Sequence, residues 1–378
     1  MKSLITLFLC FFSICAAFSQ QKQYSTRSKK AIKYYEQSTE FLKRRQYPEA
    51  INILNQALEK DPSFLEAHSR ISFSYRVLGN MKKEQYHLEQ VLELAPDIGK
   101  YKNTFFSLAD VCYKMGDYEK SLDFLQNLFK FENLNSNVYA EAKKLEVNVS
   151  FAVEAVKNPV EFNPVKLPEV INSGPLQYFP VLTVDEQQLF FTRRSGQSIS
   201  YDEDIYRSVK NEEGYWTIPE SISPNINTPH NEGTCSISAD GRVLIFTSCD
   251  NRRGFGSCDL FISEKTGKEW SIPKNLGPVI NSPNWDSQPA LSADGNTLYF
   301  VSDRPGGVGM RDIWISHKSP EGAWEKPVNL GNMINTMQDE VSPFIHSNGQ
   351  TLYFSSVGYP GFGGYDLFKV EKLHGEWS

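Results

Sequence analysis

The second half of the chain repeats itself with a period near 54 residues, and this repeat constrains the fold more than any other feature. A short turn motif of the form Ser/His-x-Asp/Asn-Gly begins at Ser238, Ser292 and His346, and a degenerate copy begins at Thr183. Asp-Gly and Asn-Gly are the strongest short hairpin signals, because both residues tolerate positive φ. Self-similarity at this period indicates an array of small modules rather than one globular core.

Each copy continues with the same three signals. An aromatic run follows the turn and begins at Leu189, Leu244, Leu298 and Leu352. An Asp-Ile/Leu-aromatic motif comes next, at Asp204, Asp259, Asp312 and Asp366. A tryptophan then opens a last strand, at Trp216, Trp270, Trp324 and Trp377. Four short strands per repeat predict the blades of a β-propeller over residues 174–378.

The first half carries a different period, near 34 residues, over 31–133. Ala50, Leu54 and Ala57 of one copy match Glu84, Leu88 and Val91 of the next. Apolar residues recur at i, i+3, i+4 and i+7, which is the stripe of an amphipathic helix. We therefore predict a helical array over 31–157, closed by a capping helix near 136–157 that covers the last apolar face.

These repeats resemble two known families. Gly-Asp-Tyr-Glu-Lys-Ser-Leu at 116–122 is close to the tetratricopeptide (TPR) consensus, and the later repeats resemble the PD40 (WD40-like) propeller family. The resemblance implies a multidomain α and all-β chain, with a TPR α-solenoid followed by a β-propeller of four-stranded blades, four of which are visible. The domain order resembles the N-terminal portion of the PorE-like, OmpA-family periplasmic proteins of the type IX secretion and gliding apparatus.

That last resemblance implies a non-catalytic scaffold that holds protein partners in the cell envelope. Those proteins carry a further OmpA-like domain that binds peptidoglycan, and no such domain lies within this sequence. Peptidoglycan binding is therefore expected only with such a further domain. Two other functions stay open: a carbohydrate- or peptide-binding propeller in nutrient uptake, and a glycosidase-like propeller enzyme.

The first residues are typical of a signal peptide. Lys2 precedes an apolar run from Leu4 to Phe18, and cleavage is expected after Ser19. The run is shorter than the roughly 20 residues that span a bilayer. The sequence around Cys15 is a poor lipidation motif, so we expect no lipid anchor. The predicted segments are 1–19 signal peptide and 20–30 linker, and the predicted location is the periplasm, associated with the outer membrane.

A linker and propeller entry strand are predicted over 158–173. Residues 161–167 match the outer-strand sequence of a later blade, residues 270–276. The fourth copy stops at Trp377, where its own outer strand begins. Either the entry segment 161–172 completes a four-bladed ring, which removes an open sheet edge, or the chain is a piece of a longer protein. We favour the second alternative.

One pair of positions at the facing ends of the second and third strands changes chemistry from blade to blade. The pairs are Arg194 with Glu203, Cys249 with Cys258, Asp303 with Arg311, and Val357 with Tyr365. Each pair is complementary, as directly facing cross-strand residues should be. Export favours an oxidising compartment, so we predict a disulfide between Cys249 and Cys258; two free thiols are the alternative.

The sequence offers no catalytic motif, and we expect no enzyme, no cofactor and no metal. A nucleophile elbow and a P-loop are absent, and the net charge of −6 argues against nucleic-acid partners. The six histidines fall in different predicted elements. Glu232, Asp286 and Glu340 recur at one position of the blade, either as a ring of carboxylates for a ligand or, as we favour, as caps of loops.

The groove of the helical array is the better binding candidate. In TPR arrays, fixed positions of each first helix line the concave face. Aromatic residues and arginine dominate interface hot spots, and several stand at these positions. The predicted partner-binding residues are Tyr35, Thr39, Phe73, Arg76, Lys102, Phe106, Asp110 and Tyr113.

Overall fold

The computed structural model describes residues 24–131, 134–198, 201–249 and 254–378. The predicted signal peptide and Cys15 lie outside the described residues. The chain divides into two compact units, Met1–Glu146 and Val147–Ser378. The boundary between them falls within the last helix, and each unit is described by itself.

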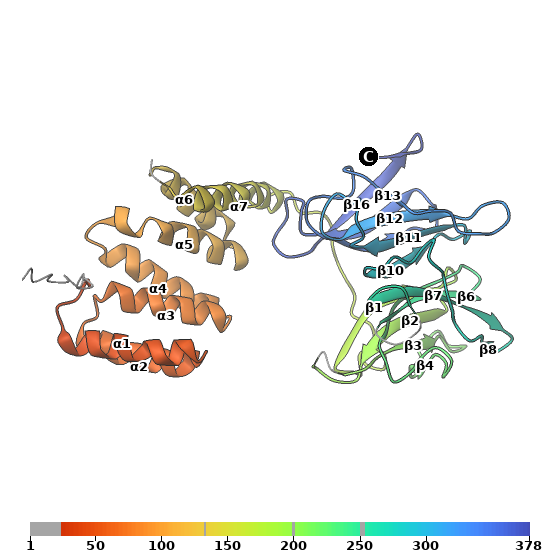
Figure 1. The fold of residues 1–378 in the computed structure, drawn as a ribbon, viewed down its shortest axis with the longest axis horizontal. Coiled ribbons are helices and arrows are strands. Elements are labelled where there is room, and N and C mark those ends of the chain that lie inside the picture. Colours follow the sequence, from red (N-terminus) through yellow and green to blue (C-terminus); the bar gives the residue numbers. More distant parts are fainter. Residues whose placement is uncertain (1–23, 132–133, 199–200, 250–253) are drawn as a thin grey trace, which may run out of the picture. The chain divides into compact units, whose positions relative to one another are not determined.

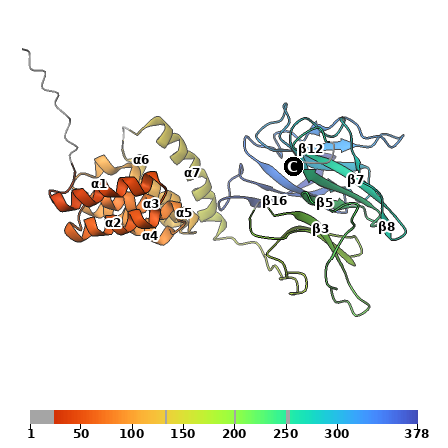
Figure 2. The ribbon, with the colours of Figure 1, turned by 60° about the horizontal axis from the view of Figure 1, so that its bottom comes forward.

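The first unit is a stack of antiparallel helix pairs (Figures 1 and 2). The first helix of each pair packs against the second, and each pair packs against the next. The elements are α1 (Lys29–Lys43), α2 (Tyr47–Lys60), α3 (Leu65–Val77), α4 (Met81–Leu94), the 3₁₀ turn η1 (Ile98–Tyr101), α5 (Asn103–Lys114), α6 (Tyr118–Phe129) and α7 (Ser136–Ala155). This arrangement is a TPR fold, as predicted.

A residue with positive φ ends the first helix of every pair. Gly79 and Gly116 adopt φ of 71° and 81°, where glycine avoids the Cβ clash, and Arg45 holds the same place at 57°. Small buried residues let the paired helices approach closely: Ser121 on α6 is fully buried and donates its hydroxyl to the carbonyl of Ala109 on α5 at 2.7 Å. The sequence repeat therefore marks turns and close contacts.

The second unit contains four antiparallel sheets in chain order, which we call blades 1 to 4 (Figure 1). Blade 1 comprises β1 (Leu176–Leu182), β2 (Gln188–Arg194), β3 (Glu203–Val209) and β4 (Glu220–Ser221). Blade 2 comprises β5 (Glu232–Ile237), β6 (Val243–Cys249), β7 (Cys258–Thr266), β8 (Glu269–Trp270) and β9 (Lys274–Asn275). Blade 3 comprises β10 (Asp286–Leu291), β11 (Thr297–Ser302), β12 (Asp312–His317) and β13 (Val328–Asn329). Blade 4 comprises β14 (Glu340–Ile345), β15 (Thr351–Ser356), β16 (Asp366–Leu373) and β17 (Glu376–Trp377).

The predicted turn motifs lie between the first and second strands of the blades. Gly241, Gly295 and Gly349 adopt φ between 66° and 71° there. In blade 1, Glu186 takes the glycine's place and adopts φ of 56°, which explains why this copy looks degenerate in sequence. A β-propeller of four-stranded blades is thus the fold of this region, as predicted, with one extra short strand in blade 2.

The cores of this unit lie between blades. Phe190 and Ile205 of blade 1 form one cluster with Ile237 and Phe246 of blade 2. Equivalent clusters join blade 2 to blade 3 and blade 3 to blade 4. Each blade therefore buries its apolar faces against its neighbours rather than within itself.

Candidate functional site

The predicted groove residues of the first repeat, Tyr35 and Thr39, both contact other residues of the same chain. The guanidinium of Arg70 on α3 lies 3.6 Å from the centre of the Tyr35 ring. The same guanidinium donates to the hydroxyl of Thr39 at 3.0 Å. The Tyr35 ring also packs against Tyr24 and Phe64 at centroid distances of 5.4 and 5.1 Å. Tyr35 and Thr39 thus form a rigid end wall rather than an open surface.

The segment before α1 covers this same end of the array. The hydroxyl of Ser25 donates to the Glu66 carboxylate at 2.6 Å and accepts the backbone N–H of Leu65 at 2.9 Å. Ser25 thereby caps the first turn of α3, whose own N-cap, Phe64, has no side chain suited to that role. The chain therefore occupies its own groove at the first repeat.

In the second repeat, the predicted groove surface on α3 is exposed to solvent. Phe73 is 51% exposed on α3, and its i+4 neighbour Val77 is 47% exposed on the same face. Arg76 extends toward α4, where its guanidinium bonds to the buried carboxylate of Glu84 at 2.5 Å. Arg76 therefore has a structural partner, whereas Phe73 and Val77 leave apolar surface in water.

The predicted groove residues of the third repeat differ in their exposure to solvent. Lys102 and Phe106 are partly exposed at the start of α5. Asp110 is paired with Lys114 at 2.7 Å on the same helix. Tyr113 is only 6% exposed and its ring packs against Tyr118, so it contributes to the interior of the repeat. Of the eight predicted residues, Phe73 is the one that offers a large exposed apolar side chain.

Two histidines that lie 19 positions apart in the sequence meet inside the array. The Nδ1 atoms of His68 and His87 are 2.9 Å apart, and both rings are buried. The His68 Nε2 lies 2.9 Å from the carbonyl of Pro62, so Nε2 carries the proton and donates. The His87 Nδ1–H must then donate to the His68 Nδ1. Burial lowers both pKa values, that of His87 to about 4.

The carboxylates that recur at one position of blades 2 to 4 are buried inside the propeller unit. Glu232, Asp286 and Glu340 are each fully buried. Glu340 accepts the Thr336 N–H and hydroxyl at 2.6 and 2.7 Å and the Ser356 hydroxyl at 2.6 Å. Burial raises the pKa of Glu340. These acids hold the loop that enters each blade, and they do not form an open ring of carboxylates.

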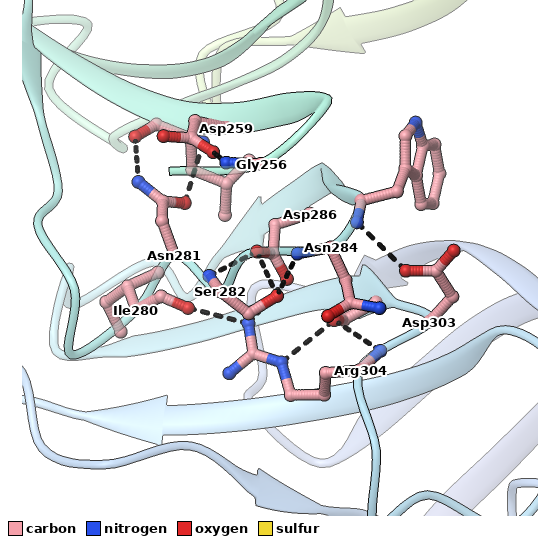
Figure 3. A network of polar contacts seen from close by, with 12 residues as sticks. Gly256, Asp259, Ile280, Asn281, Ser282, Asn284, Asp286, Asp303 and Arg304 are labelled. Carbon is pink, nitrogen blue, oxygen red and sulfur yellow. Dashed lines mark hydrogen bonds and ion pairs between the residues drawn. The ribbon is translucent and has the colours of Figure 1, made fainter. Parts of the chain in front are cut away.

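Asp286 has an additional cationic partner, shown in Figure 3. The guanidinium of Arg304 bonds to its Oδ1 at 2.5 Å and to the carbonyl of Ile280 at 2.6 Å. The hydroxyl of Ser282 donates to the other carboxylate oxygen at 2.8 Å. The charge of Asp286 is therefore balanced within the fold.

A second set of repeated acids anchors the glycine-rich loops. Asp259 accepts the backbone N–H groups of Phe255 and Gly256 at 2.7 and 3.0 Å, as Figure 3 shows for Gly256. Asp312 accepts from Val308 and Gly309 in the same way. A Cβ on Gly256 would lie 1.7 Å from the carbonyl oxygen of Asn284. These loops are turns held by an aspartate, and the glycines allow close backbone approach.

In each of the first three blades, one asparagine side chain makes two hydrogen bonds to the backbone of a single residue on the third strand. We call this pair of bonds a clasp. The Asn281 side chain accepts the N–H of Leu260 and donates to its carbonyl, both at 2.9 Å. Asn227 clasps Ile205 and Asn335 clasps Ile313 with the same two bonds. Asn227, Asn281 and Asn335 recur at intervals of 54 residues, the period of the blades.

The predicted cross-strand pairs behave differently from one another. Arg194 and Glu203 face each other in register and form an ion pair. Cys249 and Cys258 also face each other, and the structure joins them in a disulfide. Asp303 and Arg311 instead both contact Trp285: Asp303 accepts its backbone N–H at 2.9 Å, and the Arg311 guanidinium lies over its ring.

Within the described residues, no group of three or more histidines, cysteines and acids is placed to hold a metal ion. Over the same part of the chain, no helix combines the length and apolar character of a membrane span.

No protein-family model matches the sequence, and no curated protein matches it. Among solved structures, the first TPR of Spaghetti (RPAP3), bound to an HSP90 peptide, is similar with 17% identity and a TM-score of 0.30, over 34% of this chain and 96% of that chain. The Sgt2 TPR domain from Aspergillus fumigatus is similar with 16% identity and a TM-score of 0.30, over 36% and 90%. The TPR protein YrrB is similar with 24% identity and a TM-score of 0.29, over 33% and 61%.

Proposed function

We propose that this chain is a non-catalytic scaffold of the bacterial cell envelope that holds partner proteins through its helical array. The observation that carries this proposal is the exposed pair Phe73 and Val77 on the first helix of the second repeat. A half-exposed aromatic side chain on a helix is a suitable anchor for an apolar segment of a partner protein. The enclosed end of the groove at Tyr35 limits such a segment to the second and third repeats.

The resemblance in domain order supports a role in type IX secretion or gliding, with the chain exported to the periplasm and associated with the outer membrane. The burial of Glu232, Asp286 and Glu340 supports the scaffold over the glycosidase-like alternative, because none of these acids offers an oxygen to a substrate. The propeller would then supply further protein contacts.

In-cell crosslinking followed by purification tests this function. We expect outer-membrane secretion components to be recovered with the wild-type chain and to be lost with Phe73→Ala. Tyr86→Ala is a matched control, because Tyr86 is 55% exposed on α4, the second helix of the same repeat. Equal recovery with both variants, or recovery of no envelope component with the wild type, would contradict the proposal.

A further inference from the structure

A cavity of about 390 Å³ lies at the junction between blade 1 and blade 2. Its lining combines Gln188 of blade 1 with two turns of blade 2, residues 240–242 and 265–267. This volume is at the lower end of the range for pockets that enclose a small molecule. The cavity is therefore large enough for a small ligand, and the side chains around it decide which ligand fits.

Blade 1 contributes Gln188 on β2 and Arg207 on β3 to this junction. Gln188 stands two residues before Phe190, and Arg207 stands two residues after Ile205. Phe190 and Ile205 belong to the apolar cluster that joins the two blades. Side chains alternate between the two faces of a strand, so Gln188 and Arg207 lie on the face that is turned to blade 2. A Cβ on Gly241 would lie 3.5 Å from the Gln188 Nε2, so this amide reaches the turn of blade 2.

Blade 2 contributes Arg242 and Lys265 to the same junction. Arg242 stands two residues before Leu244, which belongs to the joining cluster. Lys265 pairs across the strands with Trp270, another member of this cluster. Burial lowers the pKa of Lys265, and the nearby charge of Arg207 lowers it further. Three cationic side chains from two blades therefore meet at one cavity.

The two guanidinium groups lack a partner that would neutralise them. Arg207 and Arg242 form no side-chain hydrogen bond or ion pair within the part of the chain that the structure describes. Asp240 lines the cavity, and its carboxylate accepts the Ser238 hydroxyl at 2.6 Å and the Arg242 backbone N–H at 3.1 Å. Glu220 stands opposite Arg207 on β4 but is exposed. The three cations thus outnumber the two acids beside them, which favours an anionic ligand.

The lysine belongs to the repeat, whereas the two arginines do not. In every blade one lysine ammonium lies over the ring of the tryptophan that follows it, in the pairs Lys210 with Trp216, Lys265 with Trp270, Lys318 with Trp324 and Lys372 with Trp377. At the next two junctions an isoleucine replaces Arg207, and an amide replaces Arg242: these residues are Ile262 and Ile315, and Asn296 and Gln350. The packing of a blade junction therefore requires neither arginine.

We propose that this cavity binds the phosphate group of a phosphate ester, with Arg207, Arg242 and Lys265 as its cationic ligands. A guanidinium donates paired N–H bonds to phosphate oxygens. A phosphate monoester carries nearly two negative charges at neutral pH, so it satisfies three cations better than a single carboxylate does. The Gln188 amide would donate to the ester, and Asp240 would accept from a hydroxyl group on it. This site lies in the propeller and does not depend on partner binding by the helical array.

Isothermal titration of the chain with inorganic phosphate in a buffer of low ionic strength tests the site. We expect one phosphate per chain, and binding about tenfold weaker for Arg207→Ile and for Arg242→Gln, because each variant removes charge-assisted hydrogen bonds. Both variants introduce a residue that other blades hold at the same position, and circular dichroism checks that they are folded. Lys326→Gln is the matched control: it removes one positive charge from an exposed position of blade 3 and should bind phosphate as the wild type does.

Thermal unfolding gives a second readout. Phosphate should raise the unfolding midpoint of the wild-type propeller, because it binds the folded state, and should raise that of Arg207→Ile much less. No phosphate binding by the wild type, or equal binding by the wild type and both arginine variants, would overturn the proposal.

Sedimentation with vesicles that contain phosphatidic acid distinguishes the two sources of a phosphate group. Vesicle binding that is lost with Arg207→Ile would assign the site to a lipid headgroup. Binding of inorganic phosphate without binding of vesicles would assign it to a soluble phosphate ester. Vesicle binding that both arginine variants retain, without binding of inorganic phosphate, would place the anion contact elsewhere and overturn the proposal.

Discussion

The imidazole rings of His68 and His87 share one proton inside the helical array, with their Nδ1 atoms 2.9 Å apart. The His87 ring is also stacked on Tyr75, and the ammonium of Lys83 adds to the lowering of the His87 pKa, after burial and His68. A further proton on either ring would place a positive charge in a buried site. The pair therefore stabilises the array only while both rings are neutral.

The helical array should lose stability in acid. The folded-state pKa of His87, about 4, lies below its unfolded value near 6.5, so the unfolded state binds more protons between these values and stability falls as the pH drops through that window. We expect a loss of about 2 kcal/mol, measured by urea denaturation of the array. His87→Gln should flatten this pH dependence, whereas His317→Gln, at an exposed histidine of the propeller unit, should leave the unfolding transition of the array unchanged.

Removing one clasp should destabilise the propeller. Asn281→Ala leaves the buried N–H of Leu260 unpaired, whereas the Leu260 carbonyl keeps the bond that it accepts from the N–H of Leu276 at 3.0 Å. One unpaired buried backbone N–H predicts a loss of about 1–3 kcal/mol, seen as a lower denaturation midpoint of the propeller transition. Asn296→Ala, at an exposed turn, is the control and should change the midpoint little. Equal midpoints for the two variants would remove the structural role assigned to the clasp.

The Asp286–Arg304 ion pair of blade 3 should be partly replaceable by glutamate and glycine, the residues that blade 4 has at the same two positions. Arg304→Gly leaves the buried Asp286 carboxylate without its cation, which predicts a loss of about 3–5 kcal/mol. Blade 4 has Gly358 at this position, and there the longer Glu340 reaches the Ser356 hydroxyl. Adding Asp286→Glu should therefore recover part of the loss, since Ser302 stands where Ser356 does. Thermal unfolding measures both steps; no recovery would show that Arg304 acts other than through Asp286.

The disulfide should be observable by alkylation. The chain after Ser19 contains four cysteines, and burial raises the pKa of Cys112 to about 11 and that of Cys235 to about 12. Unfolded without reductant, two thiols should react; after reduction, all four should. The double variant Cys249→Ser with Cys258→Ser should lose about 2–3 kcal/mol, as expected for closing a short loop. Four reactive thiols before reduction would show that the bond is absent.

The repeats made the fold predictable, because turns and cross-strand positions recur in the sequence. The Asp-Gly turn at Asp240 and the facing pair Arg194 and Glu203 needed only local reasoning. The contact between His68 and His87 was not predicted, because it joins two helices whose faces the repeat pattern does not orient residue by residue. The same reason explains why Tyr35, at a groove position, is covered by Arg70 and Tyr24.

The clusters that join neighbouring blades have a consequence for how such chains can evolve. Phe246 of blade 2 packs with Phe190 of blade 1, and the same two positions meet again at every later junction. A gene duplication that adds or deletes one whole copy of the repeat keeps both sides of each junction matched. Arrays of different length can then arise by in-frame recombination without redesign of a core, whereas a cut inside a blade would leave two mismatched surfaces.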